Sequence, residues 1–433
     1  MSTRPHAEGE GAQRDGSGSR DGSGSRVGSG SRDDRALPGA EAERRARVTW
    51  SLLAEPSDAV ALLARERIGP VAALELARQA TASELLAGLD GEIPTQAAEP
   101  AAGSPHARAA RALERWRGRL AAVDVEHVLE DAARRRIRVL VPGDEEWPSP
   151  IDDLREGAPH CLWVQGPGRL DHLIGERTAA LVGSRASTPY GEDVAASLAA
   201  AFAGSGGTVV SGGAYGIDAA AHRGALAARD GATLAVLAGG LDRLYPRGNA
   251  ELLERIRAQH LLVSEAPAGT APTRWRFLAR NRLIAALSRA VVVVEAAWRS
   301  GALSTARLAD QLSRPVGAVP GPVTSAASAG CHRLIRERGA VLVTDPAELL
   351  DLLPGGPAAG EGSFARQDEL DLLSPADRRV LDAVPPRSSI TPDRLADEIG
   401  FAPREVAAAL ARLELLGLVE QSGQRVRRAR RAG

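Results

Sequence analysis

The sequence predicts an α/β protein centred on a parallel β-sheet, with a small helical domain before the sheet and a winged-helix domain after it. Residues 178–343 alternate short apolar runs with helical stretches, the pattern of successive strand–helix–strand units. Residues 47–138 instead show apolar side chains at helical spacing, and residues 374–427 indicate three short helices and a two-stranded wing. Strand–helix–strand units place helices on both faces of a parallel sheet, so the central sheet is expected to be covered on both sides.

The charges balance, but one residue type carries every positive one. The 433 residues contain 54 lysine plus arginine against 55 aspartate plus glutamate, and none of the 54 is a lysine. This excludes enzymes that need a Schiff-base lysine, a pyridoxal phosphate lysine or the lysine of a P-loop. Arginine is permanently charged, so the basic side chains are expected to bind ligands rather than to act as general bases.

Several classes of protein are disfavoured by the remaining composition. Two cysteines, Cys161 and Cys331, form neither a disulfide framework nor a zinc motif, and the eight histidines show no metal-binding spacing. The chain starts with polar residues and has no uninterrupted apolar run of membrane-spanning length. We therefore expect a cytoplasmic protein that holds no metal and no cofactor.

The first third of the chain divides into a tail and a helical domain. Residues 1–46 contain a Gly/Ser/Arg hexad three times, and such a sequence buries too little apolar surface to fold. Residues 47–165 are expected to form the helical domain, with a longer amphipathic helix over 106–136 and short strands at its end.

The central domain is assigned to residues 166–352. Nearly every apolar run in it ends in Gly, Ser or an acid, and ligands of parallel sheets bind beyond the carboxyl ends of the strands. The expected strands are 178–183, 207–212, 233–239, 260–265, 290–296, 315–321 and 340–343.

The last part of the chain begins with a Gly/Pro/acid linker over residues 353–373. The winged-helix domain over 374–427 follows, and its helices open at Ser-Pro, Thr-Pro and Ala-Pro, as helix N-termini often do. A basic tail, 428–433, ends the chain, and five arginines lie within residues 425–431.

Two glycine-rich turns follow strands of the predicted sheet. The first is Gly183-Ser184-Arg185, and the second runs from Ser211 through Gly212, Gly213 and Tyr215 to Gly216. Small residues let backbone N–H groups approach an anion at a helix N-terminus, and an arginine can pair with a phosphate. Neither turn has the spacing of a dinucleotide fingerprint or a P-loop. Two such turns at one sheet edge predict an anion site.

An arginine-rich helix and a third turn complete the predicted site. Arg274, Arg276, Arg280 and Arg282 lie within nine residues together with Asn281, and no acid occurs between Glu265 and Glu295. This favours anion binding over a solvated helix face. Ser300 and Gly301 occupy another strand-to-helix turn. The three tyrosines, Tyr190, Tyr215 and Tyr245, fall beside these loops, where aromatic rings next to arginines are typical of stacking on unpaired bases.

Few residues are candidates for catalysis. Asp218, Glu265 and Glu295 are expected near the same edge and are possible acids or bases. His222 and His332 are isolated and are interpreted as helix-face residues, and no Ser-His-Asp order is recognisable.

These motifs, in this order, resemble the DNA-processing protein A family, DprA or Smf. The matching segments lie within about residues 170–345 and include VGSR, SGGAYGIDAAAHRGAL, FLARNRLIAALS, SGALSTA and GCHRLIRERGA. The resemblance implies an extended Rossmann-like domain that binds single-stranded DNA without hydrolysing it. It also implies a homodimer, protection of incoming strands in natural transformation, and a role in loading the RecA recombinase. The nucleic-acid-binding residues expected from the turns and this resemblance are Gly183, Ser184, Arg185, Ser211, Gly212, Gly213, Tyr215, Gly216, Arg276, Arg280, Asn281, Arg282, Ser300 and Gly301.

Two other functions remain open at this point. A nucleotide-binding phosphoribohydrolase of the LOG type shares this sort of fold, but the nearest segment, SGALSTARL, lacks a glutamate after its threonine. A winged-helix transcription regulator is the second alternative. Its expected recognition helix, 403–416, carries Glu405 and Glu414 beside Arg404 and Arg412, whereas base recognition usually needs several polar or basic side chains.

Overall fold

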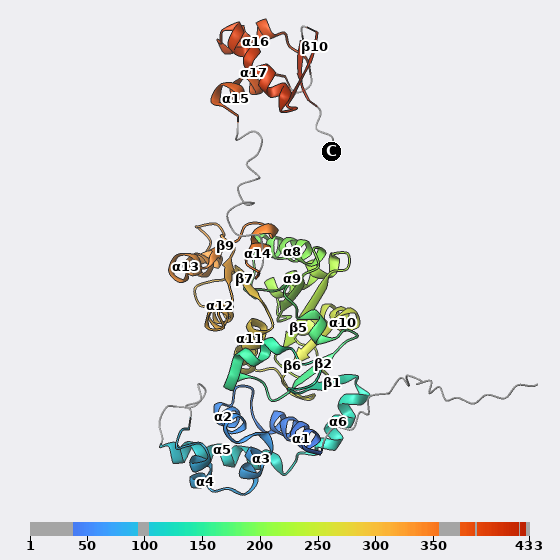
Figure 1. Cartoon of the computed structure of the whole chain (residues 1–433), viewed down its shortest axis with the longest axis vertical. Helices are drawn as coiled ribbons and strands as arrows, with labels where there is room; N and C mark the ends of the chain where they lie inside the picture. Colours follow the sequence, from blue (N-terminus) through green and yellow to red (C-terminus); the bar gives the residue numbers. More distant parts are fainter. Residues whose placement is uncertain (1–37, 94–103, 355–372, 386–387, 424, 430–433) are drawn as a thin grey trace, which may run out of the picture. The chain divides into compact units, whose positions relative to one another are not determined.

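The structure, a computed structural model, describes residues 38–93, 104–354, 373–385, 388–423 and 425–429 (Figure 1). The predicted tail up to residue 37, most of the predicted linker and the last residues of the basic tail lie outside this range. The described residues form a helical region, a nine-stranded sheet with its helices, and a winged-helix domain. None of the described helices has the length and apolar character needed to cross a bilayer.

The helical region contains six helices in its described residues and packs around tryptophan. Trp50 and Trp116 are fully buried and meet edge to face, with ring centroids 4.9 Å apart. The helices are α1 Pro38–Leu53, α2 Ala59–Ile68, α3 Pro70–Gln79, α4 Ala82–Gly88, α5 Pro105–Leu120 and α6 Val125–Arg134.

Two sequence-based boundaries in this region are wrong. The tail was expected to extend to residue 46, but α1 begins at Pro38. The Ala, Glu and Arg residues of this helix favour helical structure, and Ala46 packs into the core. The single helix expected over 106–136 is two helices. Asp124 caps the second, since its carboxylate accepts a hydrogen bond from the backbone N–H of His127 at 3.0 Å.

The sheet has the strand order β1-β2-β6-β5-β4-β3-β7-β8-β9. All pairs from β6 to β9 are parallel, which confirms the predicted α/β class, while β1 and β2 are antiparallel additions beside β6. Sequence reasoning placed β1 and β2 at the end of the helical domain, whereas they hydrogen-bond into the sheet. The strands are β1 Ile137–Leu140, β2 Leu162–Gln165, β3 Thr178–Gly183, β4 Thr208–Ser211, β5 Ala232–Leu237, β6 Leu261–Ser264, β7 Ala290–Glu295, β8 Val316–Ala318 and β9 Val341–Leu342.

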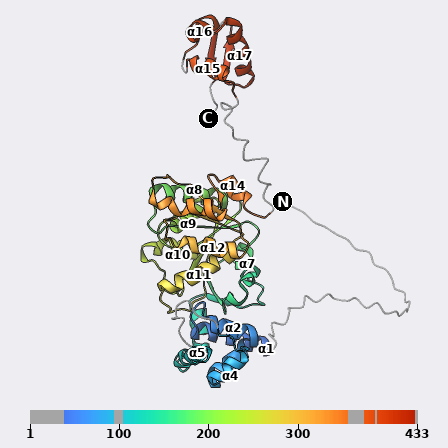
Figure 2. The same ribbon diagram turned by 90° about the vertical axis from the view of Figure 1, so that its left-hand side faces the viewer.

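Helices cover both faces of the sheet: in Figure 1 the strands β5 and β7 lie between α11 and α12 on one side and α9 and α10 on the other, and Figure 2 shows the same helices turned by 90°. Ala180 and Val182 of β3 pack towards α11 and α12, whereas Ala179 and Leu181 pack towards α8 and α9, as expected from the alternation of side chains along a strand. The helices of this domain are α7 Leu170–Leu173, α8 Pro189–Gly204, α9 Ile217–Ala227, α10 Ala250–Gln259, α11 Arg274–Ala286, α12 Ala302–Gln311, α13 Ala329–Arg338 and α14 Pro346–Asp351, and the 3-10 helices are η1 Ser149–Gly157, η2 Arg247–Asn249 and η3 Ala326–Ser328.

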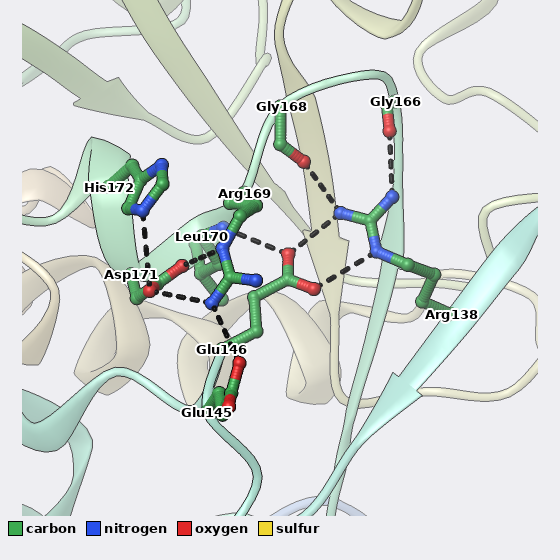
Figure 3. Close-up of polar contacts among 9 residues, drawn as sticks. All are labelled: Arg138, Glu145, Glu146, Gly166, Gly168, Arg169, Leu170, Asp171 and His172. Carbon is green, nitrogen blue, oxygen red and sulfur yellow. Dashed lines mark hydrogen bonds and ion pairs between the residues drawn. The ribbon is translucent and has the colours of Figure 1, made fainter. Parts of the chain in front are cut away.

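An arginine fork fastens the β1 edge of the sheet (Figure 3). Arg138 of β1 donates to both carboxylate oxygens of Glu146, at 3.1 and 2.7 Å, and to the carbonyl oxygens of Gly166 and Gly168. Glu146 also accepts a hydrogen bond from the backbone N–H of Leu170 at 2.9 Å. These contacts join the loop after β1 to the loop after β2. Local sequence patterns did not indicate that these two strands belong to the sheet.

The C-terminal domain is a winged helix, as predicted. Three helices pack around Val380, Leu395 and Leu410, and the wing is an antiparallel pair of strands. The elements are α15 Pro375–Ala383, α16 Pro392–Ile399, α17 Pro403–Leu415, β10 Val419–Ser422 and β11 Arg425–Arg428.

The winged-helix domain is expected to lose stability in acid through Asp377. This carboxylate is nearly buried, and its hydrogen bonds from the Arg412 guanidinium hold its pKa below the ordinary value. A depressed folded pKa gives a stabilisation that is present above the unfolded pKa, about 4, and is lost as the pH falls through the folded pKa. Asp377→Asn should therefore lower the unfolding temperature of this domain near neutral pH and reduce its dependence on pH below about 4, as followed by calorimetry. If the unfolding temperature of Asp377→Asn fell with pH below about 4 as steeply as that of the unmodified domain, the assignment of this effect to Asp377 would be contradicted.

Candidate nucleic-acid interface

A cavity of about 740 Å³ lies beyond the carboxyl ends of β3 and β7. From β3 the chain proceeds through β4, β5 and β6 on one side, and from β7 it proceeds through β8 and β9 on the other. The cavity therefore occupies the point at which the direction of strand order reverses, where open parallel sheets bind their ligands. Its walls come from the turn after β3, from α11 and from the turn before α12.

The cavity gathers half of the residues predicted for nucleic-acid binding. The predicted residues that line it are Gly183, Ser184, Arg185, Arg280, Asn281, Ser300 and Gly301. The others, which do not line it, are Ser211, Gly212, Gly213, Tyr215, Gly216, Arg276 and Arg282.

The second glycine turn is occupied from inside the protein. Asp218 accepts hydrogen bonds from the backbone N–H groups of Gly212 and Ala214, at 3.1 and 3.4 Å, and burial raises the pKa of this carboxyl. The Ser211 hydroxyl donates to the carbonyl oxygen of Leu181. The Tyr215 hydroxyl accepts from the backbone N–H of Gly248. These contacts do not fit the phosphate cradle expected at this turn, because a carboxylate already fills the anion's place.

The first turn is held in the same way by Glu295. This carboxylate, only 2% exposed, accepts hydrogen bonds from the backbone N–H and the hydroxyl of Thr188, each at 2.8 Å. A Cβ atom on Gly191 would lie 2.8 Å from the same carboxylate. Glu295 thus occupies the N-terminus of α8, where the helix dipole favours a negative charge. The turn can offer Arg185 to a ligand, but not the N-terminus of the helix.

The arginines of α11 have different environments. Arg282 pairs with Glu265 at 2.6 Å with both side chains 9% exposed, and Arg276 pairs with Glu55. Arg280 is buried and donates to the carbonyl oxygens of Gly212 and Val236, and burial lowers its pKa to about 10. All these arginines were expected to face an anion, and in this structure Arg276 and Arg282 face glutamates instead. The sequence between Glu265 and Glu295 lacks acids, but chain folding brings acids from elsewhere.

Three arginines at the mouth of the cavity remain available. Arg185, Arg274 and Arg299 are exposed, and no acid in the described part of the chain is paired with them. The Arg185 guanidinium lies 4.2 Å from the centroid of the Phe277 ring. The centroid of the Tyr245 ring lies 5.9 Å from that of Phe277. The cavity thus combines guanidinium groups with an aromatic wall.

Phe277 and Arg299 were missed by sequence reasoning. A helical-face argument would have found Phe277, because residues 274, 277, 278 and 281 lie on one face of α11 and all four line the cavity. Tyr190, by contrast, donates its hydroxyl proton to the carbonyl oxygen of Pro320 and is not among the residues that line the cavity.

The two isolated histidines both have partners inside the protein. His222 is buried against the Thr233 hydroxyl at 2.8 Å, and burial lowers its pKa to about 3. His332 contacts the carbonyl oxygen of Gly321. Among the described residues, no three His, Cys, Asp or Glu side chains gather as a metal site would require.

Most of the chain is similar to known proteins. The model of the DNA recombination-mediator protein A family matches residues 138–354, and the model of the DprA winged-helix domain matches residues 365–424. The chain belongs to the DNA recombination-mediator protein A family. The cavity therefore lies in a protein of the DprA/Smf family, and the resemblance to this family that the sequence motifs indicated is confirmed.

Individual relatives support this assignment over most of the chain. A DNA processing protein DprA of Mycobacterium tuberculosis is 44% identical over 387 residues, which cover 87% of this chain and 92% of that protein. Protein Smf of Escherichia coli is 39% identical over 286 residues, or 65% of this chain and 74% of that protein. The crystal structure of DprA from Streptococcus pneumoniae has a TM-score of 0.55 at 29% identity, covering 72% of this chain and 98% of that one.

Proposed function

We propose that this DprA-family protein binds single-stranded DNA in the cavity beyond β3 and β7. The observation that carries the proposal is the stack of Arg185 on Phe277 with Tyr245 beside it. Unpaired bases stack on aromatic rings while arginines hold the phosphates, whereas a duplex keeps the faces of its bases covered. The arrangement therefore favours a single strand, which we propose the protein binds without cleaving it.

The wider role that we infer follows from the family. The protein protects incoming single strands in the cytoplasm during natural transformation, acts as a homodimer, and assists RecA in loading onto the strand. A DNA-binding surface made of guanidinium groups suits this role, because it holds phosphates without reading a sequence. Formation of RecA filaments on a strand coated with single-strand-binding protein should accelerate when the protein is added.

A competition between DNA forms tests the binding proposal directly. An unlabelled single strand should displace a labelled oligonucleotide at a far lower concentration than the matching duplex does. Affinity should also fall as salt rises, since each phosphate contact contributes about 0.7 to the logarithmic salt slope of a single strand. Equal competition by duplex, or release of adenine from AMP, would contradict the proposal.

The winged-helix domain is not expected to supply this affinity. The exposed residues of α17 include Ala407, Ala408, Ala411 and Leu415, which offer no hydrogen bonds to base edges. Its exposed charged side chains include Glu405 and Glu414, which repel phosphates, and Arg412, which is paired with Asp377. Deleting residues 374–433 should therefore leave most single-strand affinity intact. If the truncated protein lost most of its affinity, the main DNA site would lie in the winged-helix domain and not in the cavity.

Phe277→Ala is expected to weaken binding without changing its salt dependence. The ring is the wall on which Arg185 lies, and loss of one base–aromatic stack costs about 1–3 kcal/mol. No charge is removed, so the salt slope should stay the same, as measured by fluorescence anisotropy at several salt concentrations. Phe277→Trp is the matched control, since it keeps an aromatic face and should retain the affinity. A weakened Trp variant would argue against stacking.

A further inference from the structure

The N-terminal turn of α11 carries the aromatic wall and one arginine of the cavity mouth. Arg274 and Phe277 both line the cavity and come from this turn, with Arg276 between them. Arg276 does not line the cavity. Its guanidinium instead forms a bidentate pair with Glu55, in which Nε and Nη2 each donate to a different carboxylate oxygen at 2.9 Å.

Glu55 is itself fixed in the helical region. It follows α1, and its carboxylate also accepts a hydrogen bond from Arg119 of α5 at 2.8 Å. Arg119 donates its other terminal nitrogen to the carbonyl oxygen of Leu53, at the last residue of α1. The Glu55 carboxylate therefore joins two helices of the helical region to the first turn of α11.

The Arg276 fork is more enclosed than an ordinary surface pair. The Arg276 side chain is 18% exposed, and Nη1 donates to the carbonyl oxygen of Ala271. All three guanidinium nitrogens thus have protein acceptors. Three of the five N–H donors of Arg276 are used in this way, one on each nitrogen, so the group is suited to hold a helix end in place.

We propose that Glu55 and Arg276 are positioning residues for the DNA cavity, an inference that rests on the proposed function of that cavity. The pair keeps the first turn of α11 oriented so that Phe277 faces Arg185 and Arg274 faces the mouth. Small displacements of a binding group weaken binding strongly, because the protein must then order the group when the ligand arrives.

A second possible role for Arg276, as a phosphate ligand, predicts different DNA affinities and salt slopes for the same variants. If Arg276 were a phosphate ligand held back by Glu55, removing the carboxylate would release it, and both affinity and salt slope would rise. If it positions α11, the loss of either partner lowers affinity and leaves the slope unchanged, because no phosphate contact is lost.

The test measures binding of a labelled oligothymidine to the full chain over a range of salt concentrations. Glu55→Gln and Arg276→Gln should each weaken binding about three- to tenfold, with the salt slope of the unmodified protein. The double variant should be no weaker than either single variant, since the two residues act through one contact. Hydrogen exchange of residues 274–278 should be faster in all three variants.

Matched controls separate this effect from general damage. Arg67→Gln and Glu92→Gln remove the partners of a fork that lies within the helical region and does not reach α11, so both should bind like the unmodified protein. If Glu55→Gln and Arg276→Gln also bind normally, or if their effects add, the positioning role is wrong. If the unmodified protein itself shows no single-strand affinity, the proposed function fails instead.

Discussion

Arg185→Ala is expected to weaken single-strand binding about tenfold to a hundredfold, the largest effect on affinity of any single change. The side chain is exposed at the cavity mouth, has no acid partner among the described residues, and lies on Phe277. Loss of a charge-assisted hydrogen bond to a phosphate costs about 1.5–3 kcal/mol. The logarithmic salt slope should also decrease by about 0.7, which distinguishes this variant from Phe277→Ala.

The control for this variant removes an arginine of the same charge away from the cavity. Arg229 has a side chain that is 97% exposed and does not line the cavity, so Arg229→Ala should change affinity and slope only slightly. An equal loss in the two variants would mean that binding depends on overall charge. Unchanged binding in Arg185→Ala would refute the cavity as the DNA site.

Glu265→Gln is expected to destabilise the fold by about 3–5 kcal/mol, the largest effect on stability. Arg282 forks onto both carboxylate oxygens of Glu265, at 2.7 and 2.6 Å, and both side chains are 9% exposed. Removing one partner leaves the other as an uncompensated buried charge. Urea unfolding followed by tryptophan fluorescence measures the loss, because the sheet domain contains Trp147 and Trp163.

Two further variants define the origin of this loss. Glu265→Leu combined with Arg282→Met removes both charges together and should recover most of the stability. Glu176→Gln breaks the pair with Arg289, in which the glutamate side chain is 69% exposed, and should cost less than about 1 kcal/mol. Equal losses in Glu265→Gln and Glu176→Gln would contradict the role of burial.

The sheet was largely predictable because its signal is local. The predicted strands 178–183 and 290–296 agree with β3 and β7 almost to the residue, since short runs rich in Val and Ala end at turn residues there. The strands β1 and β2 were recognised as strands but not as members of this sheet. Their partners lie far away in the sequence, and periodicity contains no information about which strands pair.

The site was predictable at the level of its elements and less so at the level of side chains. The turn with Arg185, the helix with Asn281 and the turn with Ser300 do meet at one cavity. The second glycine turn was expected to cradle a phosphate, whereas the backbone N–H groups of Gly212 and Ala214 donate to Asp218 in this structure. Whether a glycine turn binds an external anion or an internal carboxylate depends on a side chain that only the fold brings close.

The sequence alone determined the residue types available for binding, the fold class and the family to which the chain belongs. In a chain with 54 arginines and no lysine, guanidinium groups are the side chains that can offer an anion a permanent positive charge. Only the tertiary structure decided which arginines are free to do so. Arg276 and Arg282 meet Glu55 and Glu265, while Arg185 meets an aromatic ring. The physical reason is that the attraction between two charges depends on their separation in space, and this separation cannot be read from their positions in the sequence.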